Sequence, residues 1–197
     1  MRYAIDHKEE THRIIVKLAS SRFRRDGLAA VGLRPLMVDA GLTHGGFYAH
    51  FSSRAELVAE AIGAALRETL NSLSEAVAKV PEGEGLEAFI NAYLNSLHRD
   101  RPDRGCAGAA LVEEVAREPA EVRRPFTVGI EAIVSVLADQ LPPGGSEAER
   151  MNRAFGVFSL LMGALQLSRS VDDAGKSSAI LQSGRLEALS LARLRWS

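Results

Sequence analysis

Four consecutive residues carry groups that could read a nucleic acid. Thr43 and His44 offer hydrogen-bonding side chains of the kind that reach base edges in the DNA major groove. Gly45 and Gly46 follow them, and residues without side chains let a backbone approach bases or phosphates closely. The order of these residues favours contact with DNA at the start of a short helix.

Polar residues on either side could hold the DNA backbone. Tyr48 and His50 carry groups suited to phosphate oxygens. Arg34 lies near the start of the preceding helical block and Arg54 near the start of the following one, where both could flank the backbone. A polar surface residue often has no functional role, however, and that alternative stays open for Tyr48 and His50.

The elements that must position these residues are two short helical blocks, Leu33–Ala40 and His44–His50, separated by a tight turn that contains Gly41. This is the pattern of a helix-turn-helix, whose second helix enters the major groove. Phe47 and Phe51, four residues apart, would anchor that helix by packing. Further helices are expected at about 6–26, 53–80, 86–98, 106–117, 121–141, 146–171 and 177–194.

The segment GLTHGGFYAHFSSRAEL, residues 41–57, resembles the DNA-binding signature of the TetR/AcrR (tetracycline-repressor) family. The resemblance covers about residues 10–60, and Gly105-Cys106 is similar to a step that some members carry at their sixth helix. Two residues depart from the pattern. Gly32 replaces a frequent capping Thr, and Gly46 replaces a larger residue, so the operator sequence cannot be inferred.

The resemblance implies an all-α protein of about nine helices. A three-helix helix-turn-helix domain would span residues 1–54, and a bundle that binds an effector and dimerises would span residues 55–197. It further implies a homodimer formed through the last two helices, about 146–171 and 177–194, and double-stranded DNA as partner. A ligand that binds better to a dimer with a different distance between its two recognition helices would lower the affinity for DNA. We therefore expect a ligand-released repressor, although the sequence does not distinguish a repressor from an activator.

The charge distribution supports this division. The net charge of the 197 residues is −1, which by itself speaks weakly against nucleic acid. Residues 1–54, however, hold nine basic and five acidic residues, a net charge of +4, and the remainder carries −5.

The N-terminus has no apolar signal region, so a cytoplasmic location is expected. The uncharged stretch 154–167 is shorter than the roughly 18–20 residues that a membrane span needs, and a buried or interface helix is expected there.

The effector site is the least defined feature. The distribution of charges suggests neither a metal nor a cofactor, so the expected ligand is small and mostly apolar. Most of the candidate residues belong to types that are more often plain core. The candidates are Phe89, Tyr93, Cys106, Leu111, Phe126, Phe155 and Phe158.

Cys106, the single cysteine, has two interpretations. Arg101, Arg104 and an expected helix start lie near it, and both features stabilise a thiolate. It could therefore sense electrophiles or oxidants and act on the same DNA-binding switch, or it could be a small buried residue.

An enzyme is not expected, because no phosphate loop, metal-ligand spacing or nucleophile motif is present. A helical adaptor is disfavoured by the basic N-terminal region.

Overall fold

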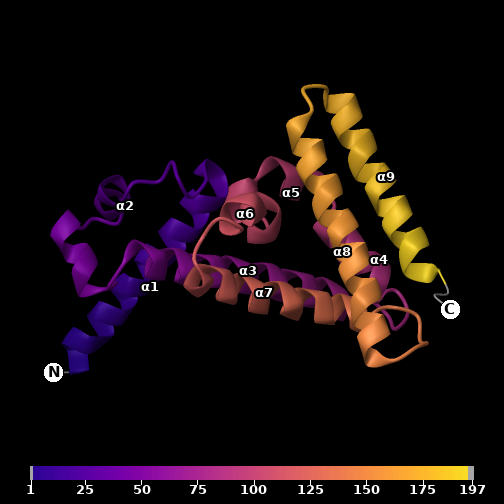
Figure 1. Cartoon of the computed structure of the whole chain (residues 1–197), viewed down its shortest axis with the longest axis horizontal. Helices are drawn as coiled ribbons and strands as arrows, with labels where there is room; N and C mark the ends of the chain where they lie inside the picture. Colours follow the sequence, from indigo (N-terminus) through magenta and orange to yellow (C-terminus); the bar gives the residue numbers. More distant parts are fainter. Residues whose placement is uncertain (1, 195–197) are drawn as a thin grey trace. The chain divides into compact units, whose positions relative to one another are not determined.

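The computed structural model describes the backbone of residues 2–194 and the side chains of residues 7–194, and within this range every regular element is helical (Figure 1). The expectation of an all-α fold is therefore confirmed. The described elements are α1 (Arg2–Asp26), α2 (Leu33–Asp39), η1 (His44–Ala49), α3 (Arg54–Ala78), α4 (Gly85–Tyr93), α5 (Ser96–Asp100), η2 (Pro102–Arg104), α6 (Ala107–Val115), α7 (Ala120–Asp139), α8 (Glu147–Ser170) and α9 (Ala174–Arg193).

The chain divides into two packed units. The first contains residues 1–67 and 102–128, and the second contains residues 68–101 and 129–197. Both α3 and α7 contribute residues to each unit. The sequence-based boundary between residues 54 and 55 separates two expected functions, DNA binding and effector binding, and is not a boundary of packing. It stays a prediction.

Glycines and caps fix several helix ends. Gly27 and Gly41 have φ angles of +86° and +74° directly after helical segments, a backbone region that glycine adopts without steric cost. At the start of α8, the Ser146 side chain accepts from the Glu149 N–H, and the Glu149 carboxylate accepts from the Ser146 N–H, which is a complete capping box.

Two helical segments differ from the expectation. The block predicted over residues 86–98 is broken at Leu94, because the Asn95 side chain accepts the His98 N–H at 2.8 Å and starts α5 as a separate helix. The block at 44–49 is a 3₁₀-helix rather than an α-helix. Such tight helical turns are common in short pieces, where few i to i−4 bonds could form.

The core of the first unit gathers side chains from α1, η1 and α3. Ile15 and Phe23 of α1, Phe47 of η1 and Leu57 of α3 are all buried. Because α1 contributes buried side chains along its length, it supports the short segment 33–50.

In the second unit, α8 and α9 form an antiparallel pair joined by a short loop, which Figure 1 shows in orange and yellow. A Cβ added at Gly184 would lie 2.6 Å from the Cβ of Ala164, so the two helices meet closely at this point. Within the described residues, no helix is long and apolar enough to cross a membrane.

Candidate nucleic-acid interface

The turn between α2 and η1 is closed by backbone hydrogen bonds. The N–H of Gly41 donates to the Val38 carbonyl at 2.9 Å, and the N–H of Leu42 donates to the Met37 carbonyl at 2.8 Å. Met37 is fully buried. The turn therefore sets a fixed angle between the two short helices, as a helix-turn-helix requires.

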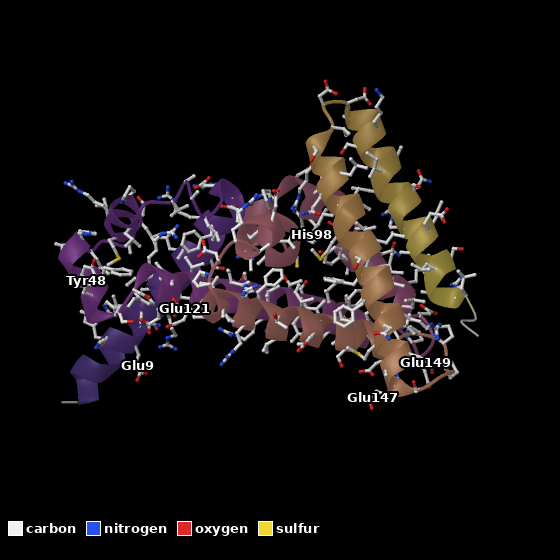
Figure 2. All side chains as sticks on the ribbon, in the orientation of Figure 1. Glu9, Tyr48, His98, Glu121, Glu147 and Glu149 are labelled. Atoms are coloured by element: carbon white, nitrogen blue, oxygen red, sulfur yellow. The ribbon has the colours of Figure 1, made fainter. Side chains whose placement is uncertain are left out.

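Aromatic rings hold η1 on the core while leaving one ring outside. Phe47 and Phe51 are buried and stack with centroids 5.4 Å apart, which confirms their expected packing role. Tyr48 packs edge-on against Phe47 at 5.2 Å, yet 66% of its surface is exposed. Figure 2 shows the labelled Tyr48 at the outer edge of the first unit.

The start of η1 presents its polar groups to solvent. Thr43, His44 and Gly45 are exposed, and Gly46 is half-buried. The Thr43 hydroxyl accepts from the Gly46 N–H at 3.3 Å and so caps η1. Neither glycine has a positive φ, and a Cβ at Gly45 would meet nothing within 4 Å. The packing of the protein itself therefore does not demand a glycine at Gly45.

His50 is half-buried at the C-terminal end of η1. Its Nδ1 atom is buried and has no hydrogen-bond partner in the part of the chain that the structure describes. Burial lowers the pKa of His50 below its ordinary value, and the nearby charges of His12 and Lys8 lower it further. The ring is therefore neutral at pH 7.

The two arginines differ in their surroundings. Arg34 is exposed in the first turn of α2. Arg54 is half-buried, donates from Nη2 to the Leu28 carbonyl, and places its guanidinium carbon 5.9 Å above the centre of the Phe23 ring. Arg54 thus has a structural role that its position in the sequence did not indicate.

The start of α3 shows a variant of the capping box. The Ser53 hydroxyl accepts the Glu56 N–H at 3.0 Å, as a capping box requires. The Glu56 carboxylate, however, accepts from the hydroxyl and the N–H of Ser52, each at 2.6 Å. These two donors lower the pKa of Glu56. The reciprocal bond has moved by one residue, and it fixes the chain between η1 and α3.

Sequence reasoning missed two side chains that tie the α6 segment to the helix-turn-helix. Glu114 of α6 accepts the N–H groups of Leu28 and Ala29, at 2.8 and 3.2 Å, in the loop before α2. Arg24, buried in α1, donates to the Gly105 carbonyl at 2.8 Å. Each bond joins residues more than 80 positions apart, so no local pattern could have revealed it.

The proposed effector-binding residues lie in both units. In the second unit, Phe89, Tyr93 and Phe158 are buried, and the rings of Tyr93 and Phe158 meet at 5.3 Å. Phe155 of α8 is 38% exposed. The first unit contains the buried Cys106 and Leu111 and the half-buried Phe126.

Known proteins share both the N-terminal sequence and the fold. Residues 15–61 match the family of bacterial regulatory proteins called the tetR family. The "Uncharacterized HTH-type transcriptional regulator YfiR" of Bacillus subtilis is 29% identical over 92 residues, 47% of this chain and 43% of that protein. The chain thus matches less than half the length of this relative.

Solved structures agree in fold. The reduced form of Escherichia coli NemR superposes with a TM-score of 0.77 at 17% identity, covering 92% of this chain and 96% of that one. A TetR transcriptional regulator from Legionella pneumophila gives 0.74 at 19% identity, covering 90% and 94%. One from Chloroflexus aurantiacus gives 0.73 at 20% identity, covering 96% of each chain. Residues 15–61 are therefore similar in sequence to the tetR family of bacterial regulatory proteins, and the chain has the fold of these solved structures.

Proposed function

We propose that this protein is a homodimeric repressor that leaves a pseudo-palindromic operator when a small, mostly apolar ligand binds. The role places the protein in the cytoplasm, where its DNA is. The DNA contacts would come from the helix-turn-helix and its flanks, namely Arg34, Thr43, His44, Gly45, Gly46, Tyr48, His50 and Arg54.

The division of η1 into a buried and an exposed side carries the proposal. Phe47 is buried, whereas Thr43, His44 and Tyr48 face solvent. The Thr43 oxygen accepts a bond within the protein, and its O–H remains a donor for a base or a phosphate. A segment that buries its apolar ring and exposes its polar groups has the form that major-groove readout needs.

The buried Nδ1 atom of His50 supports a contact through the other ring nitrogen. Buried N–H groups without an acceptor are rarer in proteins than acceptors without a donor. We therefore assign the proton of the neutral ring to Nε2. An Nε2–H donates to a phosphate oxygen without further protonation, so His50 could bind the DNA backbone at neutral pH.

The exposed apolar residues of the last two helices support dimerisation through about 146–171 and 177–194, an arrangement typical of the family. Leu167 of α8 is 55% exposed and Leu186 of α9 is 60% exposed. A Cβ at Gly156 or Gly163 of α8 would meet nothing within 4 Å, so both positions leave room for a partner helix. Two recognition segments would then lie about 34 Å apart, one turn of DNA.

The effector proposal rests on the aromatic residues of the second unit. Phe89, Tyr93 and Phe158 are buried aromatic residues, and the proposed small apolar ligand would bind among them. A ligand that binds better to a dimer unable to span the operator must lower the affinity for DNA. It does so by the same factor by which DNA lowers the affinity for the ligand. Since α3 has residues in both units, it is the natural connection between the two events.

In vitro selection of DNA tests the proposal. The full-length protein should enrich, from a random duplex library, sequences with two related half-sites whose centres lie about 10 bp or a multiple apart. A Tyr48→Ala variant should enrich none. If the wild-type protein enriches no sequence over the starting library, the proposed function is wrong.

Sensing through the thiol is the second candidate. Cys106 is the N-cap residue of α6 and is buried, so a reagent would reach it only when the chain opens locally. If thiol sensing operates, N-ethylmaleimide should weaken DNA binding of the wild-type protein and leave Cys106→Ser unaffected. If alkylation of Cys106, verified by mass spectrometry, leaves DNA affinity unchanged, this candidate is refuted.

A further inference from the structure

A small hollow lies beside the C-terminal end of the recognition segment, within the first unit. It has a volume of about 360 Å³ and is lined by Lys8, Glu9, His12 and Arg13 of α1 together with His50. Figure 2 labels Glu9 on this part of α1. The hollow brings residues from the first helix next to a residue already predicted to contact DNA.

Cations and carboxylates lie together around the hollow. Lys8 and Arg13 are exposed on α1, and the charges of His12 and Lys8 both reach His50, since both lower its pKa. Two carboxylates oppose this charge from elsewhere on the surface. Glu10 pairs with Arg13 at 2.7 Å, and Glu60 of α3 pairs with His12 at 2.7 Å.

Among the described residues, Glu9 is the carboxylate that lines the hollow, together with Lys8, Arg13 and the rings of His12 and His50. Arg13 is paired with Glu10. Lys8, by contrast, has no carboxylate within ion-pair distance among the side chains that the structure describes. Lys8 is therefore the cation of the hollow that remains available to an anion.

The ring of His12 is held in place by side chains from α3 and from the segment between η1 and α3. Its Nε2 atom bonds the Glu60 carboxylate of α3, and the ring stacks on Phe51 with centroids 4.5 Å apart. The centroid of the His50 ring lies 6.1 Å away. One wall of the hollow is thus fixed before any ligand arrives, which reduces the entropy lost on binding.

We propose that this hollow binds a backbone phosphate of the operator, through Lys8 and His50, on the flank of the major-groove contacts. The inference rests on the proposed function, because it needs DNA as the ligand. A DNA strand is favoured over free phosphate because the hollow borders His50, in the same segment that presents Tyr48. It adds Lys8 to the DNA contacts and gives His12 a positioning role.

The salt dependence of DNA binding measures the contact directly. Fluorescence anisotropy with a labelled 24-bp duplex from the selection would give the binding constant of wild type, Lys8→Gln and Lys17→Gln between about 50 and 200 mM NaCl. Lys17 is the matched control, since it is an exposed cation of α1 that does not line the hollow. One lost phosphate contact changes the slope of log K against log salt by about 0.9 per bound subunit.

Lys8→Gln should therefore show that smaller slope and a roughly eightfold weaker affinity per subunit at 0.1 M salt, and Lys17→Gln should change both much less. Equal effects of the two substitutions, or no effect of Lys8→Gln, would overturn the inference. If the wild-type protein binds no DNA at all, the proposed function itself has failed, which is a different outcome.

A second measurement separates DNA from free phosphate. The imidazole NMR signals of His12 and His50 should move when the duplex is added to the wild-type protein, and they should stay in place in 5 mM inorganic phosphate at matched ionic strength. If inorganic phosphate moves both signals and Lys8→Gln leaves the salt slope unchanged, the hollow is a site for free phosphate and the inference is wrong.

Discussion

Replacing Glu114 by Ala should loosen the loop that precedes the helix-turn-helix. The Oε2 atom of Glu114 accepts the N–H of the buried Leu28 at 2.8 Å and that of the exposed Ala29 at 3.2 Å. A hydrogen bond to a charged group contributes about 1.5–3 kcal/mol. Water replaces the bond to the exposed Ala29 N–H at little cost. The expected loss is therefore about 2 kcal/mol of unfolding free energy, carried mainly by the Leu28 N–H.

The neighbouring residue supplies a matched control. Glu113 lies on the same helix, is 84% exposed and pairs only with the exposed Arg117, an interaction of about 0.3–0.5 kcal/mol. Because both changes are Glu to Ala within α6, the gain in helix propensity is similar in the two variants.

Thermal melting followed by circular dichroism, at one fixed protein concentration, compares the two variants. With about 2–4 °C per kcal/mol for a chain of this length, Glu114→Ala should melt about 4–8 °C below wild type, and Glu113→Ala within about 2 °C of it. Glu114→Gln keeps a neutral acceptor and should fall between them. If the two alanine variants melt within 1 °C of each other, the role assigned to Glu114 is refuted.

Four further substitutions test other parts of the structure. Gly184→Ala should lower the melting temperature, because its Cβ would lie 2.6 Å from the Cβ of Ala164, whereas Gly163→Ala has open space and should reduce only dimerisation measured by sedimentation. Thr43→Val removes the cap of η1 and should cost about 1 kcal/mol in urea unfolding. The pKa of His50 lies below its ordinary value of 6.5 in the folded protein. The unfolded chain therefore takes up the proton at a higher pH than the folded protein does. The contribution of His50 to the unfolding free energy is fully present above about pH 7 and falls as the pH drops below 6.5. His50→Gln should flatten this pH dependence, and an unchanged pH dependence in the variant would contradict the assignment.

The features that sequence predicted well are those fixed by neighbouring residues. Gly41 needs its positive φ because of the turn it occupies, and Ser146 caps the helix that starts beside it. Local chemistry of this kind can be read from a few adjacent residues. The buried pair Phe47 and Phe51 likewise follows from their spacing of four positions.

The features that sequence missed depend on residues far apart in the chain. Arg54 could be assigned to DNA from its position, but the carbonyl of Leu28 that it bonds is supplied by the loop after α1. The hollow beside His50 combines a helix near the N-terminus with the end of η1. Asn95 looked like one polar residue in a helical block, although its side chain starts a new helix. Only the folded chain brings such partners together.

DNA binding by the exposed side of η1 is the central claim, and one measurement tests it most directly. Anisotropy titrations of a selected duplex would compare wild type with Tyr48→Phe, with His50→Ala and, as a control, with Lys79→Gln, which changes an exposed residue directly after α3. We predict that wild type and Lys79→Gln bind alike, with an affinity that falls steeply as salt rises, and that Tyr48→Phe and His50→Ala bind severalfold more weakly. If both substituted proteins bind like the parent, the assignment of this surface to DNA is wrong.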